Sequence, residues 1–153
     1  MTNIIITEAT LSHVQELGRT MNIEHMMEYE GIGLKAHRSL WRSWKKSMLR
    51  KTAIIDGEIA ACWGVSGSLL GVLGKPWLVT NSIARGVNPH VYARIYRAEV
   101  KEMLKIWPVL ENWVDNSYIG AVKLLKLSGF ELDEPVPLGK MKRMYSRFYK
   151  KVS

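Results

Sequence analysis

The chain has 153 residues, 47% apolar and 24% charged, values typical of one globular domain with a buried core. Its 22 Lys and Arg residues outnumber its 14 Asp and Glu residues, which gives a net charge of +8. The single cysteine, Cys62, rules out an internal disulfide, and the four histidines show no spacing typical of a zinc site. No apolar run reaches the roughly 18–20 residues of a membrane span, and the basic start of a secretory signal is absent, so we expect a soluble domain in a reducing compartment.

The first third of the chain predicts a strand and two helices. Residues 3–7 form a β-branched run typical of a strand, and Thr10 is placed to cap a helix whose apolar residues recur at helical spacing as far as Met21. Residues 30–33 contain two glycines and break this pattern. A second helix is expected between residues 34 and 48, with an apolar stripe on one face and basic residues on the other.

The middle of the chain predicts a hairpin, a strand and a long helix. Residues 52–65 contain an Asp-Gly pair between apolar runs, the pattern of a two-residue turn. A glycine-punctuated connection leads to a strand over residues 76–83. Asn88 then caps a helix with Pro89 at its first position, and Pro108 ends that helix.

The last third predicts a strand, a helix and a closing strand. Residues 109–115 form the first strand, and Asn116 or Ser117 caps the helix that follows. Gly129 is placed to end this helix in a left-handed conformation. A turn-rich link then leads to residues 143–151, which alternate as a strand does. The order of elements predicts an α/β (α+β) domain with a mixed sheet flanked by helices.

Two segments resemble the GNAT acyltransferase superfamily. Residues 4–21 are similar to its opening strand and helix, and residues 111–135 are similar to its strand–helix–strand segment that ends in a Gly-Phe pair. The resemblance implies a single GNAT-like domain over residues 1–153, with a mostly antiparallel twisted sheet. The matching positions in the second segment are Asn116, Ala121, Gly129 and Phe130.

A closer resemblance is to the GNAT-like internal virion protein A group of short-tailed bacteriophages. It rests on the stretches GKPWLVTNSI (74–83), WPVLENWVD (107–115) and LKLSGFELDEP (125–135), which occur in that group's order around a long basic helix. The resemblance implies a role in virion morphogenesis, with portal, tail or internal core proteins as partners. It places the protein in the virion or the host cytoplasm.

The stretch SIARGVNPH (82–90) stands where GNAT enzymes bind their cofactor. In that family acetyl-CoA lies between two splayed parallel strands, and its pyrophosphate rests on N–H groups of a Q/R-x-x-G-x-G/A loop at a helix N-terminus. Counting from Arg85, the two glycine positions fall on Asn88 and His90, and Pro89 removes a donor. The candidate cofactor-binding residues are therefore Arg85, the displaced Gly86, and Asn88.

The catalytic positions of the family are also altered. Many GNAT enzymes carry a tyrosine general acid four residues before the Gly-Phe glycine, and that position is Leu125 here. Tyr118 is seven residues earlier, about 10 Å along a helix, too far to replace it. Glu58, Glu111 and Asp115 are candidate bases, but none forms a recognisable acid/base pair, so no catalytic residue is assigned.

The remaining polar motifs receive no role in catalysis. The methionine-rich residues 26–33 correspond to the family's substrate loop, and we expect them to form a packed loop. We expect surface or turn positions for the four histidines, His13, His25, His37 and His90.

Two basic clusters provide most of the net charge. Each is interpreted either as a solvated face or as a contact surface for an acidic protein or nucleic acid. The first comprises Arg38, Arg42, Lys45, Lys46, Arg50 and Lys51, and the second comprises Lys140, Lys142, Arg143, Arg147, Lys150 and Lys151.

The preferred hypothesis is a GNAT fold that serves as a phage structural or assembly protein, has lost acyltransferase activity and needs no cofactor. The alternative is an active acetyl-CoA-dependent N-acetyltransferase that acts on a host protein or a small amine through a variant loop at Arg85 and Gly86. A nucleic-acid or acidic-partner role of the basic clusters is compatible with the first hypothesis.

Overall fold

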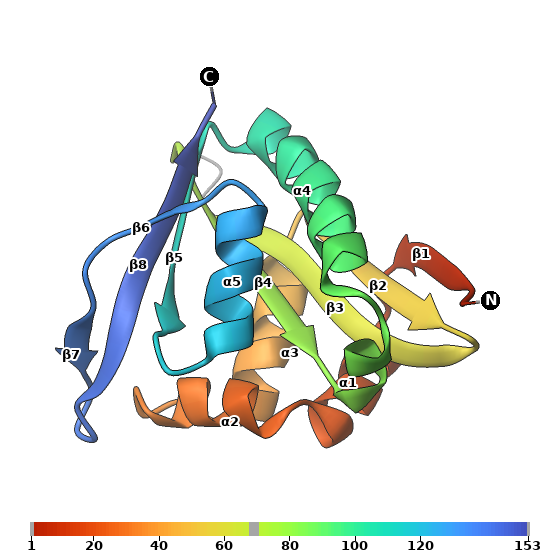
Figure 1. Ribbon diagram of the computed structural model, residues 1–153, viewed down its shortest axis with the longest axis horizontal. Helices are drawn as coiled ribbons and strands as arrows, with labels where there is room; N and C mark the ends of the chain where they lie inside the picture. Colours follow the sequence, from red (N-terminus) through yellow and green to blue (C-terminus); the bar gives the residue numbers. More distant parts are fainter. Residues whose placement is uncertain (1, 68–70, 153) are drawn as a thin grey trace.

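The fold is built around one eight-stranded sheet (Figure 1). The computed structural model of the chain describes residues 2–67 and 71–152. The strand order is β1-β2-β3-β4-β5-β8-β6, and β7 pairs with β8. The strands are β1 (Ile4–Glu8), β2 (Leu49–Ile55), β3 (Glu58–Gly67), β4 (Leu73–Thr80), β5 (Val109–Asp115), β6 (Glu131–Leu132), β7 (Val136–Leu138) and β8 (Arg143–Lys151). The helices are α1 (Leu11–Thr20), α2 (Ile23–Glu30), α3 (Ala36–Lys46), the 3-10 helix η1 (Ser82–Gly86), α4 (Pro89–Ile106) and α5 (Ile119–Leu127).

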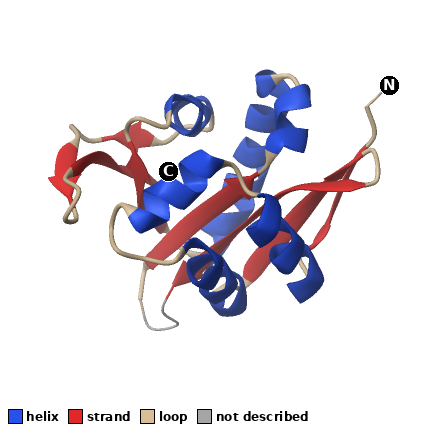
Figure 2. Cartoon of the chain, turned by 90° about the horizontal axis from the view of Figure 1, so that it is seen from below, coloured by secondary structure: helices blue, strands red, loops and turns tan. Residues whose placement is uncertain are grey.

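Helices cover both faces of the sheet (Figure 2). Successive residues of a strand point to opposite faces, and β3 serves both layers in this way. Trp63 and Val65 pack with Val100 of α4 in one buried cluster, whereas Cys62 packs with Leu17 of α1 in another. None of the helices in the described part of the chain has the length and apolarity that a bilayer crossing needs.

The sheet divides between β4 and β5, which form its parallel pair. Within the described residues these strands are in register only at Leu73–Val109 and Gly74–Leu110, and beyond these pairs they diverge. The ring of Trp107, at the end of α4, packs against Gly74, where an added Cβ would lie 2.6 Å from the indole Cγ. The glycine therefore lets Trp107 close the narrow end of the split.

Pro76 lies in the middle of the sheet, a position that normally disfavours proline. Its carbonyl accepts a hydrogen bond from Asn112 Nδ2 of β5 at 2.9 Å. The N–H and C=O groups of one strand residue point to the same side, so an N–H at position 76 would also face the split. Its absence in proline therefore removes no hydrogen bond between paired strands. The proline is tolerated because the strands diverge there.

Most sequence-predicted elements are confirmed. The hairpin turns at Asp56 and Gly57, both with positive φ (48° and 84°), as a two-residue Asp-Gly turn requires. Asn88 caps α4 and Pro89 is its first residue. Gly129 follows α5 with φ of 95°. The predicted mixed sheet flanked by helices is the observed architecture.

Several local predictions were wrong. The packed loop expected over residues 26–33 is largely the helix α2, and the turn-rich link before β8 contains the short strands β6 and β7. Helix α5 has Tyr118 at its N-cap position, so the prediction of a cap at Asn116 or Ser117 was wrong. Asn116 instead donates to Ser146 Oγ at 2.8 Å, a partner that local sequence does not reveal.

The close packing at Gly74 predicts a specific sensitivity to substitution. In the Gly74→Ala variant the new Cβ would meet three atoms of the Trp107 side chain, two of them in the ring, at 2.6–2.7 Å, so either that side chain or the strand must shift. We expect the free energy of unfolding to fall by about 1–3 kcal/mol, as measured by denaturant titration. Gly86→Ala is the matched control, since its Cβ would meet no atom within 4 Å. Equal stability of Gly74→Ala and the unaltered protein would contradict this packing.

Candidate functional site

Helix α2 runs across the open ends of β4 and β5 (Figure 1). His25 and Glu28 are three residues apart and so lie on the same side of the helix. His25 Nε2 accepts the backbone N–H of Thr80, at the end of β4, at 3.0 Å. Glu28 Oε2 accepts the backbone N–H of Asp115, at the end of β5, at 2.9 Å. Two side chains of one helix thus bind backbone donors that the diverging strands cannot give to each other.

The connection between α1 and α2 also covers the end of β4. The backbone N–H of Asn22 donates to the carbonyl of Thr80 at 2.9 Å, and Asn22 Nδ2 donates to Thr80 Oγ1 at 2.9 Å. An isolated antiparallel bridge joins Met21 to Asn81. Both backbone groups of Thr80 that face the split are therefore bonded to residues near the start of α2.

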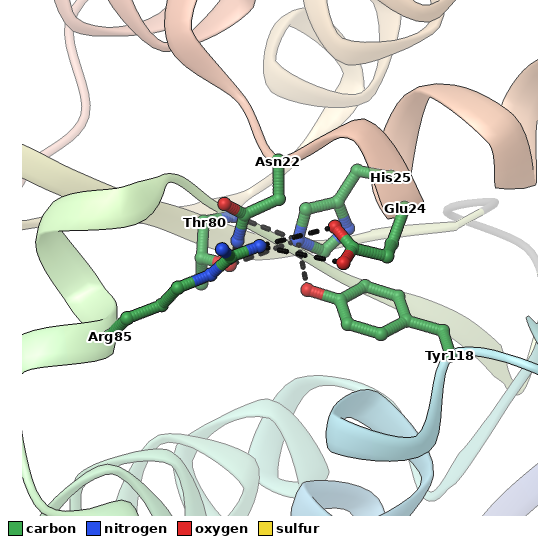
Figure 3. Close-up of polar contacts among 6 residues, drawn as sticks. All are labelled: Asn22, Glu24, His25, Thr80, Arg85 and Tyr118. Atoms are coloured by element: carbon green, nitrogen blue, oxygen red, sulfur yellow. Dashed lines mark hydrogen bonds and ion pairs between the residues drawn. The ribbon is translucent and has the colours of Figure 1, made fainter.

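His25 is the centre of a polar cluster beneath α2 (Figure 3). Its Nε2 lies 3.0 Å from Thr80 Oγ1 and 3.2 Å from the hydroxyl of Tyr118. Because Nε2 accepts a backbone N–H, the proton of the neutral ring is assigned to Nδ1. Burial lowers the pKa of His25 to about 4 and raises the pKa of Tyr118. At neutral pH the cluster thus combines an uncharged imidazole with a protonated phenol.

Glu28 carries a carboxyl group whose charge is poorly tolerated in its surroundings. Burial, and to a lesser extent the charge of Asp115, raises the pKa of Glu28 to about 7, although the N–H of Asp115 and the charge of Arg143 act in the opposite direction. Asp115 itself is buried and bonded to Arg143 Nε at 2.7 Å and to Ser117 Oγ at 2.7 Å. Tyr145 of β8 donates to the Glu28 carbonyl at 2.7 Å and fastens α2 to that strand.

A cavity of about 830 Å³ occupies the split and is lined mainly by apolar side chains of β3, β4, β5, α4 and α5. Leu125, at the position where the sequence resemblance would place a general acid, is buried in its lining. Two polar atoms of lining residues, Trp63 Nε1 and the Tyr92 hydroxyl, are buried without a hydrogen-bond partner. Unpaired buried donors are costly in the absence of a partner, so they mark places where a ligand group would be stabilised.

The three candidate cofactor contacts occupy different environments. Arg85 lines the cavity and forms an exposed ion pair with Glu24, with Nη2 3.4 Å from Oε2 (Figure 3). Gly86 ends η1, where an added Cβ would meet no atom within 4 Å and no positive φ requires a glycine. Asn88 turns its side chain onto its own helix, where Oδ1 accepts the N–H of His90 at 2.9 Å.

The candidate bases are not gathered in one place. Glu111 is paired with Arg147 at 3.0 Å, and Glu58 is exposed at the start of β3. Only Asp115 contacts α2, through its N–H to Glu28, and its carboxylate is already bonded to Arg143. In residues 2–67 and 71–152, no three His, Cys, Asp or Glu side chains gather as a metal site requires.

Sequence analysis missed His25 and Glu28. The expectation that His25 lies on the surface or in a turn was wrong, because it is 5% exposed and sits within a helix. The sequence signal for a buried helix at this place is the three-residue spacing of the apolar Met26 and Tyr29, which pack against the core beside α1 and α3. That spacing places the polar pair on an adjacent side of the same helix.

Comparison with known proteins identifies the fold. No family model and no curated protein matches the sequence. A GNAT-family acetyltransferase from Streptococcus pneumoniae superposes with a TM-score of 0.66 over 99% of this chain and 100% of its own, at 16% identity. The ribosomal-protein-alanine N-acetyltransferase of Brucella melitensis gives 0.69 over 97% and 99%, at 14% identity. The spermidine N-acetyltransferase of Vibrio cholerae, in complex with CoA and spermine, gives 0.70 over 97% and 95%, at 10% identity.

The chain has the GNAT fold. The predicted fold class is therefore confirmed. The split lies between the parallel strands β4 and β5, which is where the sequence resemblance predicts the cofactor of a GNAT enzyme. In this chain the wide end of that split is crossed by α2, and its interior is the apolar cavity.

The shifted pKa values of His25 and Glu28 predict opposite effects of pH on stability. Between about pH 4 and 6.5 the unfolded chain binds more protons at His25 than the folded chain does, so this residue makes stability rise with pH. Between about pH 4.5 and 7 the folded chain binds more protons at Glu28, so this residue makes stability fall with pH. In the unaltered protein the two effects oppose each other.

Single substitutions should separate these effects. Gln keeps an acceptor in both positions, so Glu28→Gln should gain stability relative to the unaltered protein as pH rises from 4.5 to 7. His25→Gln should lose relative stability as pH rises from 4 to 6.5. Each change should reach about 3 kcal/mol at most, measured by urea unfolding at several pH values. Differences that do not vary with pH, or that vary with the opposite signs, would refute the assigned protonation states.

Proposed function

We propose that this chain is a structural or assembly protein of bacteriophage virion morphogenesis, built on a GNAT fold that no longer carries out acetyl-CoA chemistry. The observation that supports the loss of acetyl-CoA chemistry is that backbone N–H groups of the loop before α4, where a pyrophosphate would have to bind, already donate to acceptors of the protein itself. A doubly charged anion at a helix N-terminus needs free backbone N–H groups.

The loop before α4 offers few such groups. Pro89 has no N–H, and the N–H of His90 is bonded to the side chain of Asn88. Earlier in the loop, Ile83 donates to Asn81 Oδ1 at 3.1 Å and Val87 donates to the Ala84 carbonyl at 3.2 Å. These residues form a well-capped helix start, and they do not fit a pyrophosphate.

The edge of β4 leads to the same conclusion. An extended ligand that pairs with the end of this strand would have to displace His25 from the N–H of Thr80 and Asn22 from its carbonyl. Leu125 offers no hydroxyl or thiol for proton transfer at the family's general-acid position. A packed core can persist after such losses, because packing and site chemistry depend on different residues.

The virion role rests on the resemblance of residues 74–83, 107–115 and 125–135 to the internal virion protein A group. Portal, tail or internal core proteins are the proposed partners, and the virion or host cytoplasm is the proposed location. In this account the GNAT fold provides a rigid body for assembly contacts.

An active N-acetyltransferase is the second candidate, and the cavity favours it. Glu28 has a pKa near 7, as a general base requires, and Tyr118 presents a protonated hydroxyl to His25 on the same helix as Glu28. The unpaired donors of Trp63 and Tyr92 would suit an oxygen-containing group. The acceptor would be a host protein or a small amine, and α2 would have to move before a cofactor could enter beside Arg85 and Gly86.

Acetyl-CoA binding distinguishes the two candidates. We expect no saturable rise in melting temperature and no calorimetric binding signal with acetyl-CoA, because the loop donors are already bonded. A saturable stabilisation that grows with ligand concentration would contradict the proposal.

In that event, Arg85→Glu should weaken binding if the cofactor uses the predicted position. Arg97→Glu is the matched control, since it makes the same charge change on an exposed residue of α4 that does not line the cavity.

A separate experiment tests the virion role. Deletion of the gene from the phage that encodes it should sharply reduce the yield of infectious particles, and the unaltered gene supplied in trans should restore the yield. A gene carrying Arg85→Glu should restore it equally, because the proposed role needs no cofactor. Full particle yield without the gene would refute the virion role, and failure of a well-folded Arg85→Glu protein would refute the claim that the role needs no cofactor contact.

A further inference from the structure

One of the two acid-free basic segments of the chain lies on α3 and the start of β2. Residues 35–51 contain seven Lys and Arg residues and no acidic residue. The rest of the chain carries 15 basic and 14 acidic residues, which leaves it with a charge of only +1 against +8 for the whole. Residues 140–151 carry six further basic residues and no acidic one, so the positive field of the protein originates from two segments, and acidic residues elsewhere offset part of it.

Within this segment the cations differ in their contacts. Arg50 has internal partners, since it stacks on Trp44, donates to the Trp44 carbonyl at 3.0 Å and lies 3.7 Å from Glu8. The other cations of α3 and its N-cap have no carboxylate within ion-pair distance among the described residues. We call these residues the α3 basic face: Lys35, Arg38, Arg42, Lys45 and Lys46.

The second basic cluster of the sequence is different. Arg143 is bonded to the buried Asp115, and Arg147 bridges Glu111 and Asp133 at 3.0 and 2.7 Å. These arginines hold β8 to its neighbours, and much of their charge is balanced within the fold. The structure therefore separates two clusters that look equivalent in the sequence.

The α3 basic face is held rigidly outward. Ala36 and Leu40 bury the opposite side of the helix, and Trp44 Nε1 donates to the Ala9 carbonyl at 2.7 Å. Arg38, Arg42 and Lys45 follow one another at spacings of four and three residues, so they form a stripe about 10 Å long. The helix lies on the far side of the sheet in Figure 1, opposite α4 and α5, and is independent of the cavity.

One aromatic ring lies within the stripe. Trp41 is 40% exposed, and Lys45 Nζ lies 4.8 Å from the centre of its ring. An exposed aromatic ring among unpaired cations is typical of surfaces that contact phosphates and stack bases. Protein interfaces, in contrast, usually have a charge-depleted apolar centre. The α3 basic face has cations along its whole length, which favours a polyphosphate partner.

We propose that the α3 basic face binds nucleic acid through its phosphates, without reading the base sequence. This contact does not depend on whether the cavity binds acetyl-CoA. Because each neutralised phosphate releases condensed counterions, three to five contacts on duplex DNA give a slope of log Kobs against log salt of about −3 to −4.5. Between 50 and 200 mM salt the affinity should then fall by about 60-fold to 500-fold.

The test is fluorescence anisotropy with a labelled 20-base-pair duplex of arbitrary sequence, with a single strand of the same length as a second probe. The triple variant Arg38→Gln, Arg42→Gln, Lys45→Gln should bind at least about 100-fold more weakly at 50 mM salt and lose about 2.7 from the magnitude of the slope. The control Lys140→Gln, Lys142→Gln, Lys151→Gln removes the same charge from exposed residues of the second cluster and should bind as the unaltered protein does.

Circular dichroism and melting temperature should show that both triple variants are folded, because all six substituted side chains are exposed. Only Lys151 lies in a strand, β8. Trp41→Ala should weaken single-strand binding more than duplex binding if the ring stacks on bases. No binding of either probe at 50 mM salt would refute the proposal. Equal losses in the two triple variants would also refute it, and so would a preference for polyglutamate over DNA, which would indicate an acidic protein partner.

Discussion

The fold depends on how two backbone N–H groups are satisfied where a sheet opens. Thr80 and Asp115 end the two parallel strands, and the divergence of the strands leaves each N–H without a strand partner. A buried, unpaired N–H would cost free energy comparable to a lost hydrogen bond. One helix, α2, supplies both acceptors from adjacent turns, His25 for one strand and Glu28 for the other.

This solution creates the unusual electrostatics of the site. An imidazole that must accept a backbone N–H cannot also be protonated on the same nitrogen, and its burial favours the neutral form. Burial of the Glu28 carboxyl, which accepts the N–H of Asp115, raises its pKa to about 7, although that hydrogen bond itself acts in the opposite direction. The perturbed pKa values therefore follow from the requirement to cover the strand ends, and they do not by themselves imply catalysis.

Sequence reasoning succeeded where a signal is local. The Asp56-Gly57 turn, the Asn88 cap with Pro89, and the helix end at Gly129 are each determined by a few neighbouring residues. The Asn-Pro pair also predicted that the start of α4 has few free donors, because a cap and a missing N–H can both be read from the sequence.

It failed where the partner is distant. His25 bonds to a residue 55 positions away and Glu28 to one 87 positions away, so neither role can be inferred from neighbouring sequence. The structural roles of Gly74, which admits the Trp107 ring, and of Pro76, which needs no strand partner, likewise depend on the divergence of β4 from β5. The two basic clusters could be listed from the sequence, but only the fold distinguishes the unpaired α3 basic face from arginines already paired on β8.

Helix α2 closes the wide end of the split between β4 and β5 through the bonds of His25 and Glu28. Amide hydrogen exchange measured by NMR tests this closure most directly. If α2 closes the split, the amides of Thr80 and Asp115 exchange as slowly as those of Val79 and Val114 within the same strands. Exchange of the Thr80 and Asp115 amides at the rate of exposed loop amides would show that α2 does not cover the strand ends, and it would contradict the account.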